Sequence, residues 1–446
     1  MIKPTALAIG GFDTGGGAGV ESDIKTFESL GVHGVSAITA ITSQNTKGIR
    51  DVLPIDPDHL KSQIDALLDD FQVKSAKIGM IISSKQMEIV GDSLSGIPFV
   101  VDPVIFAKDG TKLIGDVDSL KKVLLRKALV VTPNAIEASI LSGVKVSTLE
   151  DQIRASKLIH ELYSVPFVIV KGGHIESNES IDVMFDGHEI IQLRSPRLDA
   201  KNTHGTGSVF ASSISALIAK GVDVKSGFKI AKQVVEDSIR FGLQVGKGIG
   251  PVDPIARLER KAMKIDVIRD MERFAEFAEG EKNFHLLIPE VQSNLAHSID
   301  PSYVTGLEDI ATFKGRIIRE WGGKTRVGMP PSFGYPTHTA RLLLSIILKE
   351  KKATTLMNIR YDEKILNALK AIGYEIVEVD REKEPKGPEG RTMSWIIDFL
   401  YEHLGRIPNV IFDKGMVGKE AMIRLWTNSI DEMIDSLRLV IKGVSP

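Results

Sequence analysis

The stretch of residues 202–208 contains residue types that can hold a phosphate group. It is a polar loop interrupted by Gly205 and Gly207, and it leads directly into an apolar run of helical length at residues 209–219. Such a loop presents several backbone N–H groups, and the helix behind it adds the positive end of its dipole. The glycines let an anion approach the backbone without meeting a Cβ atom. The pattern is typical of an anion site, although an ordinary glycine-rich helix start fits this loop alone equally well.

The elements that must position this loop are apolar runs separated by helix-sized intervals. The first run, at residues 6–9, leads into a glycine loop at residues 10–19. The later runs lie at residues 34–42, 75–80, 98–104, 128–132 and 166–170. Several are continuous and β-branched, as expected of parallel strands covered on both faces. Their alternation with amphipathic stretches predicts a three-layer α/β sandwich, with a hairpin at residues 181–194.

Polar residues follow these strands at the points where open α/β sheets hold their ligands. The set comprises Gln44, Met80, Asp102, Asn134, Glu137 and Lys171. Each one alone is better explained as a cap or turn residue, and Asp102 for example precedes a proline. So many on one edge of a sheet are much harder to assign to chance. The glycine loop at residues 10–19 matches neither a dinucleotide fingerprint nor a P-loop.

Length and composition limit the class of protein. With 446 residues, about two or three domains are expected. The formal net charge of −2 suggests no general affinity for nucleic acid or an anionic membrane. The absence of cysteine rules out disulfides, thiolate metal sites and a cysteine nucleophile. The sequence has no signal-peptide pattern and no apolar run long enough to span a bilayer, so we expect a cytoplasmic protein.

Residues 5 to about 250 resemble the hydroxymethylpyrimidine/phosphomethylpyrimidine kinases of thiamine biosynthesis, which belong to the ribokinase-like superfamily. The motifs occur in family order across the whole segment and are together highly specific. The matching pieces are residues 11–19, 23–27, 42–46, 77–80, 101–104, 132–134 with Glu137, 171–174 and 202–207.

The resemblance implies ATP-dependent phosphorylation of the pyrimidine hydroxymethyl group and then of the resulting monophosphate, with Mg²⁺ and backbone N–H groups neutralising charge. It implies that Gln44 hydrogen-bonds the pyrimidine edge. The implied substrate-binding residues are Gly11, Asp13, Ala18, Asp23, Gln44 and Met80; those for the nucleotide are Asn134, Lys171 and Thr206; those for the metal are Asp102 and Glu137; the catalytic group is Gly205, Gly207 and Ser208.

Ser208 departs from the pattern of the family. Ribokinase-like enzymes usually have Asp at this position, and the pyrimidine kinases typically have Cys. A serine hydroxyl is a much weaker base than either at neutral pH. Ser208 could relay the proton to a phosphate or a neighbouring carboxylate, it could only orient the substrate hydroxyl, or the kinase could be slow or lost. We favour orientation of the hydroxyl, since every other motif is in place.

A second α/β pattern follows a Gly- and Pro-rich stretch at residues 246–254. We expect domains at residues 1–255 and 283–446, with a charged helical segment at 256–282 that fits a linker or the first helix of the second domain. The strand candidates are residues 316–318, 355–359, 374–379 and 409–412, and the helix candidates are residues 338–348, 363–372, 392–404 and 430–441. No repeat of the first domain and no DNA-binding helix-turn-helix is found.

Cationic residues beside glycines characterise this second half. A glycine loop precedes a helix whose first turn holds His338 and Arg341, three residues apart and therefore on one face. Other polar clusters lie at residues 357–360, 389–391 and 413–420. Helix starts with Arg and Lys favour a site for a multiply charged phosphate ligand. For any single Arg or Lys, a plain surface charge is the better explanation.

Residues 285–443 resemble the ThiN-type thiamine-phosphate synthase domain, which is found fused behind the pyrimidine kinase. The matching pieces are residues 315–317, 333–334, 338–341, 357–360, 389–390, 413–415 and 418–420. The resemblance implies coupling of hydroxymethylpyrimidine diphosphate to hydroxyethylthiazole phosphate, with release of diphosphate. The implied residues are His338 and Arg316 in catalysis, with Arg316 as the first choice of partner for His338, and Arg341, Asn358, Arg360 and Lys419 in substrate binding.

Two other classes of protein stay open. The second domain could sense thiamine phosphate without catalysis, but sensors usually follow a DNA-binding module and would not need His338. The first domain could phosphorylate another small alcohol, such as pyridoxal or a sugar; Gln44 and Met80 argue against this. The expected partners are small-molecule substrates, without nucleic acid or membrane, and the resemblance implies a homo-oligomer.

Overall fold

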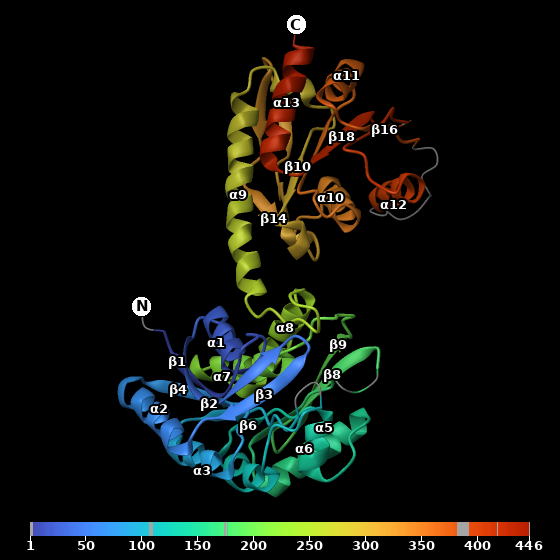
Figure 1. Cartoon of the computed structure of the whole chain (residues 1–446). Coiled ribbons are helices and arrows are strands. Elements are labelled where there is room, and N and C mark those ends of the chain that lie inside the picture. The colour runs from blue at the N-terminus through green and yellow to red at the C-terminus, as the bar shows by residue number, and fades with distance from the viewer. Residues whose placement is uncertain are drawn as a thin grey trace. The chain divides into compact units, whose positions relative to one another are not determined.

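The computed structural model describes residues 3–106, 110–173, 175, 177–380, 392–416 and 418–445, without the side chains of 392–394 (Figure 1). The chain divides into two compact units, Met1–Leu258 and Glu259–Pro446. None of the helices in these described ranges is long and apolar enough to cross a membrane.

Unit 1 contains a nine-stranded sheet in the order β3-β2-β1-β4-β5-β6-β7-β8-β9. The strands are β1 (Thr5–Asp13), β2 (His33–Asn45), β3 (Gly48–Pro54), β4 (Val73–Ile78), β5 (Phe99–Val101), β6 (Val130–Val131), β7 (Phe167–Val170), β8 (Glu179–Phe185) and β9 (Ile190–Pro196). The strands from β2 to β7 in this order are parallel, and β3, β8 and β9 are antiparallel additions. The predicted parallel sheet and the predicted hairpin, β8–β9, are both present.

Helices cover both faces of this sheet. They are α1 (Gly19–Ser29), α2 (Pro57–Asp70), α3 (Ser84–Ser93), α4 (Val117–Ser119), α5 (Ala135–Ser142), α6 (Leu149–Tyr163), α7 (Thr206–Ala219) and α8 (Val224–Arg240). Figure 1 shows α2, α3, α5 and α6 on one side and α1, α7 and α8 on the other. Alternate strand residues face opposite layers: Val101 packs in the core beside α2, α3, α5 and α6, and Val100 packs in the core beside α7 and α8. The three-layer α/β sandwich is therefore confirmed.

Helix α7 lies in the interior of unit 1. Most of its residues are buried, and many are Ala or Ser, which lets α7 pack closely against the sheet and α1. Ser212 of α7 donates to Asp23 of α1 at 2.6 Å, and Lys77 of β4 contacts both Asp23 oxygens at 2.8 and 2.9 Å. Asp23 is 0% exposed and Lys77 is 1% exposed. The ion pair therefore joins three elements within the core.

Unit 2 contains a seven-stranded, mainly antiparallel sheet in the order β14-β11-β10-β15-β18-β17-β16. Its strands are β10 (Leu295–Ser298), β11 (Ile310–Phe313), β14 (Pro331–Phe333), β15 (Thr355–Arg360), β16 (Ile376–Glu378), β17 (Val410–Asp413) and β18 (Met422–Thr427). Only β16 and β17 pair in parallel. The predicted strand at 316–318 instead belongs to a separate hairpin of β12 (Ile317–Glu320) and β13 (Lys324–Val327).

The helices of unit 2 also pack on two sides of its sheet. They are α9 (Ala256–Gly280), α10 (His338–Lys349), α11 (Glu363–Ile372), α12 (Thr392–Leu404) and α13 (Ile430–Val444). Helices α9, α11 and α13 contribute to one core, and α10 and α12 to the other. Because Met271 and Phe274 of α9 are fully buried in the first core, most of this charged helix is part of unit 2 rather than a free linker.

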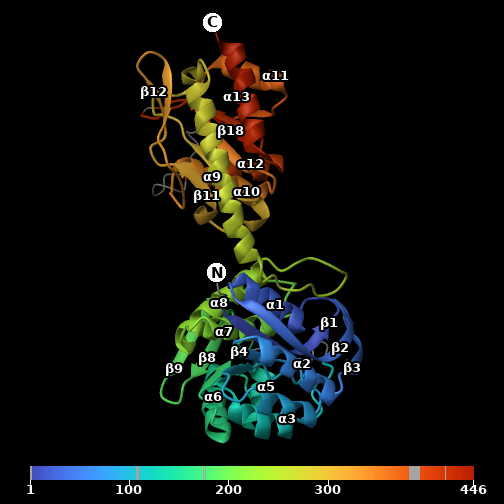
Figure 2. The ribbon, with the colours of Figure 1, turned by 90° about the vertical axis from the view of Figure 1, so that its left-hand side faces the viewer.

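The tryptophans occupy three different environments in unit 2. Trp321, in the turn of the β12–β13 hairpin, is 100% exposed, and Figure 2 shows this hairpin projecting from the side of the unit. Trp395 of α12 is partly buried against Phe399. Trp426 of β18 is buried, and its indole N–H donates to the Pro408 carbonyl.

Candidate active sites

The carboxylate of Asp13, at the end of β1, organises the glycine loop behind it. Its oxygens accept the N–H groups of Gly15 at 2.8 Å, Gly17 at 3.2 Å and Ala18 at 2.9 Å. His204 Nε2 lies 2.8 Å from Asp13 Oδ2. Burial raises the pKa of Asp13, but the hydrogen bonds from His204 and the loop lower it, and the net pKa lies below the usual range. Asp13 is therefore ionised at neutral pH and shapes the loop.

The anion loop predicted at residues 202–208 lies directly against this glycine loop. Gly205 caps α7 with φ +86°, and a Cβ there would stand 1.8 Å from the Gly17 carbonyl oxygen. A Cβ on Gly17 would in turn stand 2.5 Å from the ring of His204. Only glycine fits at this contact, because a side chain at either position would have to displace backbone or ring atoms. The two glycines thus bring distant segments of the chain together.

A cation and two carboxylates lie at the start of α7. Lys171 Nζ is 2.8 Å from Asp102 Oδ1, and a Cβ on Gly207 would stand 3.2 Å from that nitrogen. Burial lowers the pKa of Lys171, but Asp102 and Glu137 raise it to a net value above the usual range. The amine is therefore charged, as a phosphate-binding group needs to be.

Glu137 belongs to the same cluster through α5. It forms a capping box with Asn134: Asn134 N–H donates to Glu137 Oε2 at 2.8 Å, and Asn134 Oδ1 accepts from Glu137 N–H at 2.9 Å. Burial raises the pKa of Glu137 to about 7; Lys171 opposes this effect and Asp102 adds to it. A nearby cation would return this carboxylate to its charged form.

The donors in this cluster fit a magnesium ion. Mg²⁺ is usually bound through one or two carboxylates together with substrate phosphates, and Asp102 and Glu137 supply two. No group of three or more His, Cys, Asp or Glu side chains suited to a metal occurs among the described residues. A pair of carboxylates beside a lysine is thus compatible with a metal that arrives with a nucleotide.

Other predicted kinase residues lie on the Asp13 side. A Cβ on Gly11 would stand 3.0 Å from Met80 Sδ, so these two residues are in contact, and Gln44 Nε2 lies 3.2 Å from His204 Nε2. Ser208 is buried in the first turn of α7, behind Thr206, and its hydroxyl makes no hydrogen bond to another residue in the described ranges. The first unit thus has a side with Met80 and Gln44 and a side with Lys171.

Asp23 was expected to contact the substrate, but the structure places it behind the site. Its carboxylate is wholly buried and is bound by Lys77 and Ser212. The sequence could not indicate this, because a charged residue early in a helix beside a glycine loop ordinarily faces solvent. His174, within one of the matching motifs, lies outside the described residues.

In unit 2, two of the predicted residues, Arg316 and Asn358, contact the segment 290–294. Arg316 Nη1 donates to the Val291 carbonyl at 3.1 Å. Asn358 Oδ1 accepts the Asn294 N–H at 2.8 Å, and its Nδ2 donates to the Gln292 carbonyl at 3.1 Å. The side-chain amide of Asn358 therefore holds backbone.

The charged glycine loop also reaches segment 290–294. Glu420, next to Lys419, accepts the N–H groups of Glu290 and Val291 at 3.0 and 2.9 Å. Arg360 ends β15 opposite Met422, which starts β18. Arg360 and Lys419 are both exposed. Asp413, the first residue of that loop, forms a buried ion pair at 2.8 Å with Arg424 on the neighbouring strand. Sequence reasoning missed Arg424, which belongs to none of the motifs.

His338 enters from a different loop. It opens α10 behind the N-cap Thr337, with Arg341 one turn along. The preceding Gly334 donates to the Ile310 carbonyl, at the first residue of β11, whereas Arg316 follows the far end of that strand. The strand register therefore gives no support to a direct pairing of His338 with Arg316. The cluster at 389–391, and Val417 in the 413–420 loop, lie outside the described residues.

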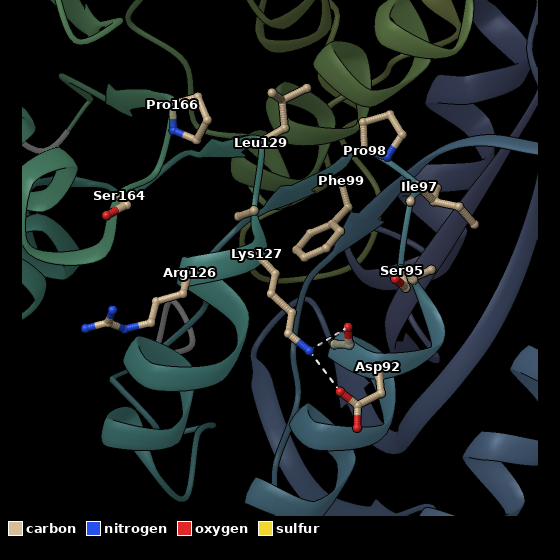
Figure 3. Close-up of a pocket in the computed structure, with 14 residues that line it drawn as sticks. Asp92, Ser95, Ile97, Pro98, Phe99, Arg126, Lys127, Leu129, Ser164 and Pro166 are labelled. Carbon is tan, nitrogen blue, oxygen red and sulfur yellow. Dashed lines mark hydrogen bonds and ion pairs between the residues drawn. The ribbon is translucent and has the colours of Figure 1, made fainter.

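A hollow of about 700 Å³ lies at the opposite end of the parallel strands of unit 1 (Figure 3). Its walls include Phe99, Leu129 and Pro166, at or just before the starts of β5, β6 and β7. Lys127 at its edge donates to the Gly91 carbonyl and to Asp92. None of the predicted site residues lines this hollow, which separates it from the chemistry at the carboxyl ends of the strands.

A doubly covered parallel sheet, with a glycine loop and a helix start beside a half-buried lysine at its carboxyl edge, is the arrangement of a small-molecule kinase of ribokinase-like fold. The chain belongs to the phosphomethylpyrimidine kinase family, whose model matches residues 13–253. A second family model, thiamine-phosphate synthase ThiN, matches residues 270–439. The chain is thus an enzyme of thiamine biosynthesis in which a phosphomethylpyrimidine kinase domain is followed by a ThiN domain.

Known proteins of thiamine biosynthesis are similar to a little more than half of this chain. The hydroxymethylpyrimidine/phosphomethylpyrimidine kinase of Bacillus subtilis is 39% identical over 257 residues, which are 56% of this chain and 94% of that protein. The thiamine biosynthetic bifunctional enzyme TH1 of Arabidopsis thaliana is 38% identical over 58% of this chain and 51% of that enzyme.

Solved structures match the kinase unit. The ADP complex of Bacillus subtilis pyridoxal kinase has a TM-score of 0.54 and 31% identity, covering 58% of this chain and 100% of that chain. Staphylococcus aureus pyridoxal kinase with AMP-PCP and pyridoxal has a TM-score of 0.53 and 32% identity, covering 57% and 94%. Structures with these nucleotides indicate that the shared kinase fold binds ATP.

Proposed function

We propose that unit 1 transfers phosphate from ATP to 4-amino-5-hydroxymethyl-2-methylpyrimidine and then to its monophosphate. The observation that carries the proposal is the approach of two clusters at the start of α7. The Asp13 cluster brings Gln44 close to His204, and Lys171 and Asp102 lie beside Gly207. A pyrimidine on the first side would direct its hydroxymethyl group toward a phosphate on the second.

The residues of the second cluster divide the work of phosphoryl transfer. Mg²⁺ held by Asp102 and Glu137 would supply charge neutralisation. Lys171 binds phosphate oxygens. The N–H groups of the first turn of α7 donate hydrogen bonds to the transferred group and stabilise the negative charge that develops on it. Ser208 orients the substrate hydroxyl, and Asn134 and Thr206 contact the nucleotide.

Pyridoxal is the second candidate substrate. The similar solved structures include pyridoxal kinases that match nearly the whole kinase unit at 31–32% identity. Pyridoxal also carries a primary alcohol on a nitrogen ring. Measuring kcat/KM for both alcohols with the same preparation decides between them, and we expect the pyrimidine to be preferred.

We further propose that unit 2 joins the pyrimidine diphosphate to hydroxyethylthiazole phosphate. Arg316, Arg360 and Lys419, around segment 290–294, would bind the departing diphosphate, whose charge must be stabilised as the bond breaks. His338 and Arg341 would act from the start of α10. The chain would act as a cytoplasmic homo-oligomer on small molecules. The alternative is a unit that binds thiamine phosphate without catalysis.

One incubation tests both units. The protein is mixed with ATP, Mg²⁺, the hydroxymethylpyrimidine and the thiazole phosphate, and thiamine phosphate is measured by chromatography. We expect His338→Ala to abolish thiamine phosphate while the pyrimidine diphosphate still accumulates. Intact synthesis in that variant would remove His338 from the mechanism, and the diphosphate without any thiamine phosphate in the parent would favour the sensor.

The role of Ser208 has its own test. We expect Ser208→Ala to lower kcat while Ser208→Cys retains or raises it, because a thiol has the lower pKa and can accept the proton. A Ser208→Ala variant with the parent kcat would show that the hydroxyl takes no part in the chemistry.

A further inference from the structure

His204 connects the two loops of the kinase site, although the sequence suggested no role for it. Its side chain is 21% exposed. Its Nε2 atom lies 2.8 Å from Asp13 Oδ2 and 3.2 Å from Gln44 Nε2. His204 also sits between backbone partners, since its N–H donates to the Gly250 carbonyl and its carbonyl accepts from Val252. The ring is therefore held in place beside Gln44.

The proton on the His204 ring can be assigned from Asp13. The Asp13 carboxylate accepts three backbone N–H groups and stays ionised, so the ring nitrogen facing it must donate. With the proton on Nδ1 instead, a lone pair on Nε2 would face an anionic oxygen at hydrogen-bond distance. His204 therefore carries a proton on Nε2, and this single proton points mainly at Asp13. A protonated Nε2 has no lone pair to accept from an NH₂ group, so the Gln44 amide atom 3.2 Å away fits as the oxygen, which takes a share of the same proton.

Thr42 leads to the same orientation from the other side. Its hydroxyl donates to the Phe12 carbonyl at 3.0 Å, which uses its single proton. The contact of Thr42 Oγ1 with the Gln44 amide at 3.4 Å then needs a donor on Gln44. Turning the Gln44 amide by 180° exchanges its oxygen and nitrogen, which places an acceptor beside the His204 N–H and a donor beside Thr42 Oγ1.

We propose that His204 is a positioning residue that fixes the amide of Gln44, with its oxygen toward the His204 ring and its NH₂ group toward Thr42. The inference rests on the proposed pyrimidine kinase activity and extends it to substrate choice. An aminopyrimidine edge carries an amino donor beside a ring-nitrogen acceptor, which a side-chain amide can match with its remaining lone pair and N–H. Because the amide cannot turn, one orientation of the ring is favoured over its reverse.

The test is a comparison of two substrates in two variants. The substrates are the aminopyrimidine and its analogue in which hydrogen replaces the amino group. The variants are His204→Ala and, as a variant that retains a donor for Asp13, His204→Gln. His188→Ala, on the exposed turn between β8 and β9, is the matched control. KM for ATP and kcat are measured in parallel and report on the intact phosphate side.

We expect His204→Ala to raise KM for the aminopyrimidine about tenfold, as the loss of a hydrogen-bonded orientation implies, with KM for ATP and kcat little changed. The ratio of kcat/KM between the aminopyrimidine and its analogue should fall by the same factor. His204→Gln should recover part of this ratio, and His188→Ala should match the parent.

Two outcomes overturn the inference. An unchanged ratio in His204→Ala, with lower kcat and a higher KM for ATP, would mean that His204 only maintains the loops. An unchanged ratio with parent-like kinetics would mean that Gln44 is held by other groups. If the parent does not phosphorylate the aminopyrimidine at all, the proposed function fails instead, and the two failures are thereby distinguished.

Discussion

The buried ion pair between Asp23 and Lys77 provides a quantitative test of the fold of the kinase unit. Replacing Lys77 by Met leaves the Asp23 carboxylate buried with Ser212 as its remaining hydrogen-bond donor among those found in the structure. Removing one partner of a buried pair costs about 3–5 kcal/mol, since the other charge is left uncompensated. For a unit of this size, the unfolding midpoint should fall by about 6–20 °C.

The pH dependence of this loss has a defined sign. Burial raises the pKa of Asp23, and Lys77 is the largest opposing effect, so the Lys77→Met change moves this pKa further upward. A carboxyl whose pKa is raised in the folded state penalises folding only above its unfolded pKa of about 4. The deficit of Lys77→Met should therefore be largest at neutral pH and shrink as the pH falls toward 4.

Thermal unfolding of the full chain, followed by circular dichroism, measures these effects. Asp23→Leu combined with Lys77→Met should recover most of the midpoint, because an apolar pair of similar volume replaces the two charges. The control is Lys61→Met, which breaks an exposed Lys61–Asp65 pair and should leave the midpoint unchanged. A Lys77→Met midpoint equal to that of the parent, or a double variant no better than the single one, would refute the reasoning. If the double variant is stable but has no kinase activity, the predicted contact of Asp23 with the substrate would be supported after all.

Three further predictions concern the glycine contact, the buried acid and the synthase loop. Gly205→Ala should lower kinase kcat/KM at least about tenfold, because its Cβ would collide with a backbone oxygen; Gly143→Ala, with a similar φ of +75° and open space, should lose about 1–2 kcal/mol of stability and keep its activity. Because the pKa of Glu137 is about 7, the parent becomes less stable as the pH rises from about 4.5 through 7. The stability of Glu137→Gln relative to the parent should therefore increase by on the order of 3 kcal/mol between pH 5 and pH 8. Thermal unfolding measures this difference, and a difference that does not change with pH would contradict the prediction. Glu420→Ala frees the backbone of segment 290–294 and should lower synthase kcat/KM about ten- to hundredfold with kinase activity unchanged; equal synthase rates would show that the segment does not shape the site.

The parallel sheet of unit 1 could be predicted because several of its strands lie in continuous, β-branched apolar runs, as strands covered on both faces do. Unit 2 was harder, since β10, β11 and β14 have four residues or fewer and include buried polar residues such as His297 and Thr312. Unit 1 also has short strands, β5 to β7, but these lie within the longer apolar runs that the sequence shows, whereas β10, β11 and β14 leave no period to detect. The pattern at 316–318 correctly predicted a strand, but the sequence alone did not show that this strand, β12, belongs to a separate hairpin with β13.

The candidate site shows a similar division. Residues at strand ends could be named from the sequence, because strand order brings the carboxyl ends of parallel strands to one edge. The contact of Asp13 with His204 could not, since it depends on two glycines in segments far apart in the chain. The histidine within the 202–208 loop was the available signal, and local spacing did not distinguish it from a turn residue.

The positions of the tryptophans make the two units distinguishable by fluorescence. Trp321, Trp395 and Trp426 are the three tryptophans of the chain, and all belong to unit 2. Tryptophan emission therefore reports on the synthase unit directly, whereas circular dichroism reports on both. Iodide should quench the fully exposed Trp321 and spare the buried Trp426. A diphosphate ligand that orders the loops beside the β12–β13 hairpin would be detected as protection of a single fluorophore.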